Sequence, residues 1–149
     1  MKRRTKKIGK VVSFAASEER RFGEQAGQSQ QKLNKQIAKL GELNSYRQDY
    51  ASKNPAITGA SAAHWKDFHM FLHRLDQAVI SQQHLVKQGE QNLESHRRRW
   101  LAKRQKLESL QRVLDKSVRR DTLYLERLEQ KLLDDLPNAV DSILKPRSR

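Results

Sequence analysis

The chain has 149 residues and a formal net charge of +14 at pH 7, and none of its residues is Cys. Hydrophobic residues make up 36% and charged residues 32%, which excludes a thick globular core but leaves enough apolar material for a narrow seam between helices. The lack of Cys excludes a disulfide framework and any Cys-based zinc site. The positive charge favours an acidic partner: nucleic acid, an anionic membrane surface or an acidic protein.

The first residues combine a basic head with a short apolar run, as a signal peptide does. The run from Val11 to Ala16 is interrupted by Ser13, whereas a signal needs roughly 7–15 apolar residues. No stretch approaches the ~18 apolar residues of a membrane-spanning helix. We therefore expect neither a cleaved signal nor a transmembrane segment.

A weak seven-residue apolar repeat predicts a first helix from about residue 10 to 53. One heptad position holds Ile8, Ala15, Phe22, Ser29, Gln36, Leu43 and Tyr50, and the other holds Val12, Glu19, Ala26, Leu33, Leu40 and Arg47. A connector from about residue 54 to 61 follows, in which Pro55 and Gly59 break the helix. Ser61 is a candidate N-cap for the next helix.

A stronger repeat predicts a second helix from about residue 62 to 136. Steps of seven from Leu72 reach Val79, Val86, Leu93, Trp100, Leu107, Leu114, Asp121 and Leu128, so eight of the nine positions are apolar. The companion position is more polar and holds Phe68, Leu75, Gln82, Gly89, His96, Lys103, Leu110, Ser117 and Tyr124. A strong and a weak heptad position together indicate a coiled coil with a partly polar seam.

The short connector makes the two helices antiparallel neighbours. The predicted fold is all-α: an antiparallel coiled-coil hairpin in a single domain, 1–149, with a longer second helix and basic flexible termini. If Tyr50 faces Trp65, then Val12 faces the region of Lys103. The apolar stripe from Leu107 to Leu128 then extends beyond the first helix and needs an external partner or self-association.

The sequence contains no phosphate-binding glycine loop, nucleophile elbow or metalloprotease motif. His69 and His73 share a helix face, but two histidines without a third ligand seldom hold a metal. We therefore expect no enzyme, no cofactor and no metal site.

Two groups of residues are candidate binding surfaces. The first is a basic stretch from Arg97 to Arg120, which the antiparallel pairing brings to the same end as the basic residues of Lys2–Lys10. Such a stretch fits a solvated surface or an acidic protein better than nucleic acid, because aromatic residues are not interleaved for base stacking.

The second group lies near the connector and holds Leu43, Tyr46, Tyr50, Trp65, Phe68, Phe71, Leu75 and Ala78. Core packing explains most of that group, and the rest is a candidate docking face.

The connector region also carries a family resemblance. The pattern is Leu43, Tyr46 and Tyr50, a short connector, then Trp65, Phe68, Phe71, Leu72, Leu75, Asp76, Ala78 and Val79, with Trp100 and Leu107 further on. Over about residues 10–136 this pattern resembles the FliJ family of flagellar export proteins. The resemblance implies an antiparallel coiled coil similar to the central stalk of rotary ATPases.

The resemblance also implies partners and a location. These are the export ATPase hexamer, whose ring assembly the protein promotes, the cytoplasmic part of the membrane export gate, and export chaperones. Nucleic acid is not expected. The implied location is the cytoplasm, peripherally at the inner membrane of the flagellar base.

Two sets of site residues follow from the resemblance. The gate-facing set is Lys39, Leu43, Tyr46 and Tyr50 with Phe71, Leu75, Ala78 and Gln82. Lys39 and Gln82 depart from the family pattern, which has Gln and His there. We assign ATPase contact to the basic residues Arg104, Lys106, Arg112, Lys116, Arg119 and Arg120.

Three alternatives remain open at this point. A self-associating structural filament would show a mass that depends on concentration. A stalk protein of a virulence-type secretion system would share the fold and the mechanism. A basic coiled coil that binds nucleic acid through phosphates would instead lose affinity steeply with salt.

Overall fold

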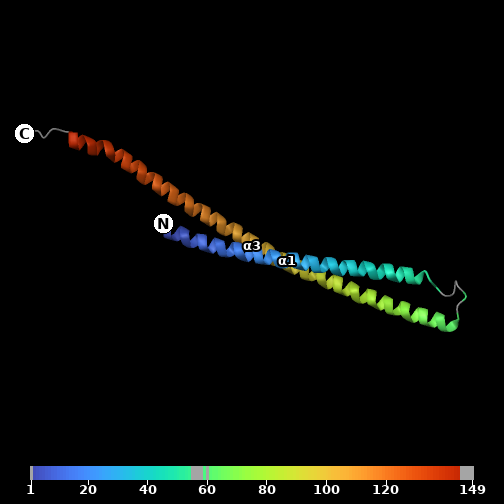
Figure 1. Cartoon of the computed structure of the whole chain (residues 1–149). Coiled ribbons are helices and arrows are strands. Elements are labelled where there is room, and N and C mark those ends of the chain that lie inside the picture. Colours follow the sequence, from blue (N-terminus) through green and yellow to red (C-terminus); the bar gives the residue numbers. More distant parts are fainter. Residues whose placement is uncertain (1, 55–58, 60, 145–149) are drawn as a thin grey trace, which may run out of the picture. The chain divides into compact units, whose positions relative to one another are not determined.

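The computed structural model describes residues 2–54, 59 and 61–144, which form two long helices and no strand. Helix α1 spans Lys2–Ala51 and helix α3 spans Ala62–Leu144. The two helices are antiparallel and α3 is the longer (Figure 1). The predicted all-α hairpin is thereby confirmed. None of the described helices has a window apolar enough to cross a membrane.

The helices extend further than their apolar repeats predicted. Helix α1 begins at Lys2 instead of near residue 10, because Thr5 anchors its start through Oγ1 to Ser117 Oγ and Asp121 Oδ2, each at 2.6 Å. Helix α3 continues past the predicted end near residue 136 and through Pro137 to Leu144. Proline removes one backbone donor, and the helix here is exposed, so water can satisfy the carbonyl that loses its partner.

The start of α3 is capped as expected. Ser61 Oγ accepts from His64 N at 3.4 Å, and the Ser61 carbonyl accepts from Trp65 N at 3.0 Å. Gly59 has a φ of +70°, a conformation that L side chains rarely adopt. Pro55, the other predicted helix breaker, lies outside the described residues. The cap and the glycine explain why α3 starts where it does.

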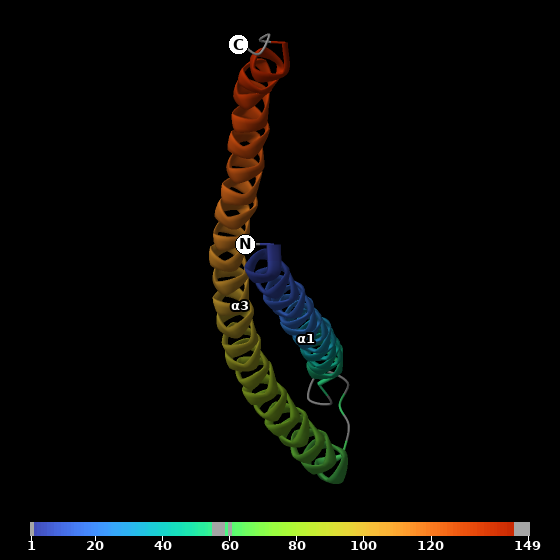
Figure 2. The same cartoon turned by 90° about the vertical axis from the view of Figure 1, so that its left-hand side faces the viewer.

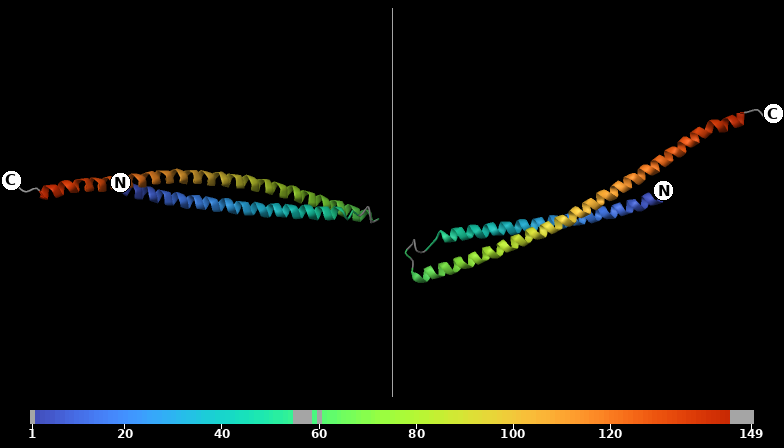
Figure 3. Two further views of the ribbon diagram at one scale, coloured as in Figure 1. Left: turned by 90° about the horizontal axis from the view of Figure 1, so that it is seen from above. Right: turned by 180° about the vertical axis from the view of Figure 1, so that it is seen from behind.

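Contacts within the chain form two compact units, residues 1–18 with 103–149 and residues 19–102, which we call the terminal unit and the turn unit. In the turn unit the last part of α1 runs beside the first part of α3 (Figures 2 and 3). The buried side chains of this unit occupy predicted heptad positions: Ala26, Leu33, Phe68, Leu75, Val79, Gln82 and Leu93. The heptad repeat therefore identified the seam correctly.

The seam of the turn unit is polar in its middle. Gln82 is 4% exposed, and its Nε2 donates to the Gln36 carbonyl at 2.9 Å. Gln36 Oε1 and His96 Nδ1 are buried, and among the described residues neither has a hydrogen-bond partner. Buried polar positions of this kind lower coiled-coil stability and restrict register. The hydrogen bond from Gln82 to the Gln36 carbonyl joins the two helices and so favours this alignment.

In the terminal unit α1 and α3 are also antiparallel, and their register differs from the predicted one. Lys103 Nζ lies 3.6 Å from Glu18 Oε2, whereas the sequence placed Lys103 opposite the region of Val12. Instead, Val11 and Ala15 share a small pocket with Lys106 and Leu110. The helices are offset because Tyr50 stacks on Phe68, at 5.0 Å between ring centroids, and not on Trp65.

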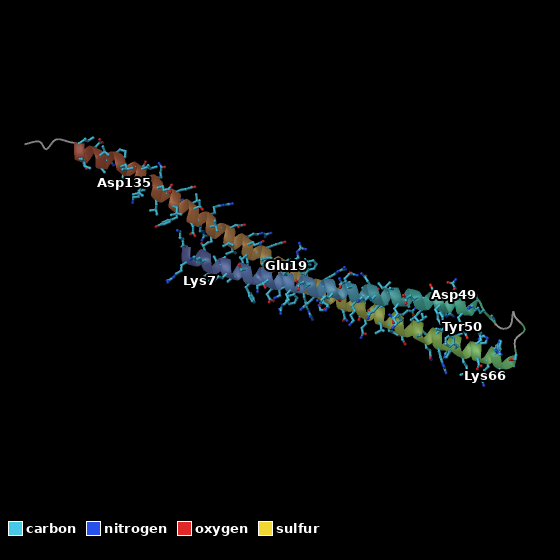
Figure 4. All side chains as sticks on the ribbon, viewed as in Figure 1. Lys7, Glu19, Asp49, Tyr50, Lys66 and Asp135 are labelled. Carbon is cyan, nitrogen blue, oxygen red and sulfur yellow. The ribbon has the colours of Figure 1, made fainter. Side chains whose placement is uncertain are left out.

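Helix α3 continues beyond the start of α1 in the terminal unit. A pocket lined by Lys2, Asp121, Tyr124 and Leu125 marks the end of the pairing. We call residues 125–144 the α3 extension, and every one of them is exposed. Asp135 lies on this part of α3, away from α1 (Figure 4). The prediction that the stripe lacks an internal partner was wrong for Leu107, Leu110 and Leu114, which are half-buried because α1 starts earlier than expected. Only the part of the stripe from Leu125 onward is unpaired within the chain.

Candidate functional site

The eight residues assigned to the export gate, which we call the turn-end surface, lie in the turn unit and fall into three groups by exposure. Lys39 and Tyr46 are exposed, and Leu43, Tyr50, Phe71 and Ala78 are half-buried, whereas Leu75 and Gln82 are buried. The buried pair faces the seam, at 7% and 4% exposure. Residues that a partner can touch without opening the hairpin are therefore the other six.

Aromatic rings join the two helices at this surface. Tyr50 lies 4.7 Å from Phe71 between ring centroids, and Tyr46 meets the edge of the same ring at 6.4 Å. Figure 4 labels Tyr50 near the turn end of α1. Aromatic pairs of this geometry stabilise by about 0.5–1.5 kcal/mol beyond burial. Tyr46 is nevertheless 53% exposed, so the aromatic cluster both holds the hairpin and presents a ring to solvent.

The exposed edge continues along both helices by heptad steps. Phe71, Ala78 and Leu85 are seven residues apart on α3, and Lys39 and Tyr46 are seven apart on α1. Because Tyr46 contacts Phe71, these positions lie along the same edge of the hairpin. The edge is apolar on α3, since Leu85 is 44% exposed and Ala78 half-buried.

Sequence reasoning missed an ion pair beside this edge. Arg47 Nε donates to Asp76 Oδ1 across the two helices. The hydrogen bond and the charge of Asp76 raise the pKa of Arg47 above its usual value. Both side chains are about 40% exposed (42% and 40%), so solvent weakens the pair. The sequence signal for this ion pair was Arg47, a charged residue at a heptad position of the seam, where it needs an acidic partner.

The six residues assigned to the ATPase lie on α3 in the terminal unit, and all of them are exposed. We call them the basic surface. Arg112, Lys116 and Arg119 follow at i, i+4 and i+7 and so share one helix face. Arg4 of α1 lines the same pocket as Lys116 and Arg120. The two basic clusters of the sequence are thus brought together, as predicted from the antiparallel pairing.

Not every cation of the basic stretch belongs to this surface. Lys103 lies in the seam beside Glu18, Arg97 donates to Gln30 Oε1 at 2.8 Å, and Arg98 donates to Glu94 Oε1 at 2.7 Å. At the start of α1, Lys2, Arg3 and Arg4 lie at the positive end of the helix dipole, where cationic side chains are electrostatically unfavourable.

The remaining candidate does not form a site. His69 packs against Trp65 with ring centroids 4.2 Å apart and the ring planes tilted by 55°. Within the described ranges, no group of three or more His, Cys, Asp or Glu residues could hold a metal ion.

The fold and its surfaces define a class of protein: an antiparallel coiled-coil hairpin whose candidate binding residues lie along the helix edges. Residues 5–139 match the family model described as Flagellar FliJ protein. The chain belongs to this family, which is a non-enzymatic component of flagellar protein export. No curated protein and no solved structure matches the chain.

Proposed function

We propose that the chain links the flagellar export ATPase to the cytoplasmic part of the membrane export gate and promotes assembly of the ATPase ring. One observation carries the proposal: the chain presents two chemically different surfaces in different units. The turn-end surface is aromatic and apolar, and the basic surface is cationic. An adaptor needs two separate surfaces so that one partner does not displace the other.

The basic surface is the proposed ATPase contact. Its six cations are exposed, and Arg4 adds a further charge from α1. If these residues prefer acidic groups that come together only in the assembled ring, binding shifts the ATPase toward that ring. The chain performs no bond chemistry in this role.

The turn-end surface is the proposed gate contact. Tyr46, Phe71 and Ala78 offer apolar area beside the charged Lys39, a mixture typical of protein interfaces. Export chaperones are further proposed partners, and the proposed location is the cytoplasmic face of the inner membrane at the flagellar base.

ATP hydrolysis by the cognate export ATPase tests the proposal, measured with and without the chain at about 0.15 M ionic strength. We expect stimulation at fewer chains than ATPase protomers, because one chain serves a whole ring. A lack of stimulation together with a lack of co-elution would reject the ATPase role. The alternative function, nucleic-acid binding, is tested by measuring duplex DNA affinity over a salt series. That function predicts measurable binding that weakens steeply as salt rises.

A further inference from the structure

The α3 extension continues the apolar face of the hairpin seam, but with an eleven-residue repeat in place of the seven-residue repeat. From Leu110 the seam positions are Leu114, Ser117 and Asp121, and the apolar residues that follow in the same steps of three and four are Leu125, Leu128, Leu132, Leu136, Ala139 and Ile143. The pattern repeats every eleven residues, as Leu114, Leu125 and Leu136 show. An eleven-residue repeat keeps one face of a helix pointed at a partner helix. The extension therefore has the pattern of a coiled-coil strand.

The partner of this strand is not α1. Seam residues such as Leu110 and Leu114 are half-buried against α1, whereas Leu132 is 66% exposed and Ile143 81% exposed. Helix α1 begins at Lys2, level with Asp121 and Tyr124. The apolar face that packs on α1 therefore continues along α3 past the start of α1. About 30 Å of this face is exposed to solvent at the ~1.5 Å rise per residue.

We propose that a second copy of the chain covers this stripe, with the two α3 extensions paired antiparallel about a two-fold axis. The stripe is close to palindromic: in the antiparallel direction Leu125 meets Ile143, Leu128 meets Ala139, and Leu132 meets Leu136. A self-complementary surface of this kind gives a closed dimer. The pairing also ends each extension near the other copy's α1, so no part of the stripe stays uncovered.

The distribution of charge also makes the α3 extension a better dimer contact than the rest of the chain. Residues 125–144 carry five acidic residues (Glu126, Glu129, Asp134, Asp135 and Asp141) against Arg127 and Lys131, while the whole chain carries +14. Two copies repel each other along their basic parts and meet with less repulsion here. Pro137 does not obstruct the contact, because its position lies away from the stripe on the helix.

Sedimentation velocity of the chain alone, over a concentration series, tests the inference independently of any ATPase. We expect the mass to rise from 17.4 kDa toward twice that value, with a dissociation constant on the order of micromolar for so small an interface. We also expect tighter association as salt rises, because screening weakens the repulsion between basic parts. A single-chain mass at every concentration would overturn the inference.

Matched variants separate the stripe from general hydrophobicity. Leu132→Glu places charge on the stripe and is expected to weaken the dimer at least 100-fold. Leu123→Glu places the same charge on the opposite face, where Leu123 is 46% exposed, and is expected to change the dissociation constant less than threefold. Circular dichroism checks that both variants keep the helices. Equal weakening by the two variants, both still helical, would overturn the inference.

Disulfide trapping tests the direction of pairing, because the chain has no natural Cys. A mixture of the Leu125→Cys and Ile143→Cys variants is expected to give the mixed disulfide as the main product. Leu125→Cys alone is expected to give little cross-linked dimer. Efficient cross-linking of Leu125→Cys to itself would indicate a parallel pair and would overturn the antiparallel arrangement.

Discussion

Gly23 lies against the indole of Trp100 in the turn unit. A Cβ placed at residue 23 would lie 3.0 Å from Trp100 Nε1 and 3.2 Å from its Cε2. The same Nε1 donates to Glu19 Oε1 at 2.8 Å. The missing side chain at residue 23 lets a large aromatic ring enter a narrow two-helix seam and still satisfy its donor.

Substituting Gly23 by Ala should therefore change hairpin stability differently from substituting a glycine that has no neighbour at its Cβ position, such as Gly27. Gly27→Ala is expected to stabilise the hairpin by about 0.5–1 kcal/mol, the helix-propensity gain over Gly, since nothing lies within 4 Å of its Cβ position. Gly23→Ala gains the same propensity but displaces Trp100, so we expect it to be less stable than Gly27→Ala by about 1 kcal/mol or more.

Urea unfolding followed by circular dichroism measures both free energies of unfolding. Tryptophan fluorescence, to which Trp65 also contributes, is expected to shift in Gly23→Ala because Trp100 moves, and not to shift in Gly27→Ala. Equal stabilisation by the two substitutions would contradict the steric role of Gly23.

Gln82 tests whether a residue assigned to the gate acts in the seam instead. Because Gln82 is buried and bonds the Gln36 carbonyl, Gln82→Leu exchanges one net hydrogen bond for apolar burial. We expect the free energy of unfolding to rise by about 1 kcal/mol, with gate affinity changed less than twofold. Gln83→Leu, at the exposed neighbouring position, is the control and is expected to stay within ±0.5 kcal/mol. A large loss of gate affinity for Gln82→Leu would assign Gln82 to the contact.

The sequence predicted the fold well because the period of apolar residues is a local property. The heptad positions of both helices lie in the seam up to Asp121, including polar members such as Gln82 and Lys103. The last two, Tyr124 and Leu128, are exposed. Helix ends were predicted less well. The start of α1 depends on the hydrogen bond from Thr5 to Asp121. The register of the two helices depends on the stacking of Tyr50 on Phe68. Such contacts join residues far apart in the chain, and no local pattern encodes them.

The candidate site was only partly predictable for a related reason. The sequence showed a helical face of residues spaced i, i+4, i+7 and i+11. It did not show which edge of that face the other helix covers. Leu75 and Gln82 lie on the covered side and Tyr46 on the open side. Exposure of the basic surface was easier to predict, because long cationic side chains rarely leave water without a partner.

Tyr46 and Leu75 should separate binding from stability at the turn-end surface. Tyr46→Ala removes a half-exposed ring and is expected to cost about 1 kcal/mol of hairpin stability or less, while weakening gate binding at least tenfold. Leu75→Ala removes a buried seam residue and is expected to cost about 2–4 kcal/mol.

Isothermal titration with the cytoplasmic part of the gate gives the affinities, and urea unfolding gives the stabilities. Ile37→Ala is the matched control, because Ile37 is an exposed apolar residue of α1 outside the turn-end surface. Unchanged gate affinity for Tyr46→Ala would remove this edge from the proposed contact.

The basic surface should bind through charge, so reversing charge on one face should abolish ATPase stimulation. We expect Arg112→Glu combined with Arg119→Glu to reduce stimulation at least tenfold, since the two residues share an exposed face of α3. Stability should change by less than about 1 kcal/mol, because surface substitutions away from the seam have small effects.

Two comparisons make this last prediction specific. Lys32→Glu with Lys35→Glu reverses two exposed charges of α1 in the turn unit and matches the change in net charge; stimulation is expected to fall less than twofold. Raising the ionic strength should weaken ATPase binding, whereas the proposed dimer should tighten. Salt therefore separates the two interactions of the terminal unit, because one joins opposite charges and the other is limited by repulsion between like charges. Equal loss in both charge-reversal variants would mean that total charge, and not the basic surface, controls the ATPase.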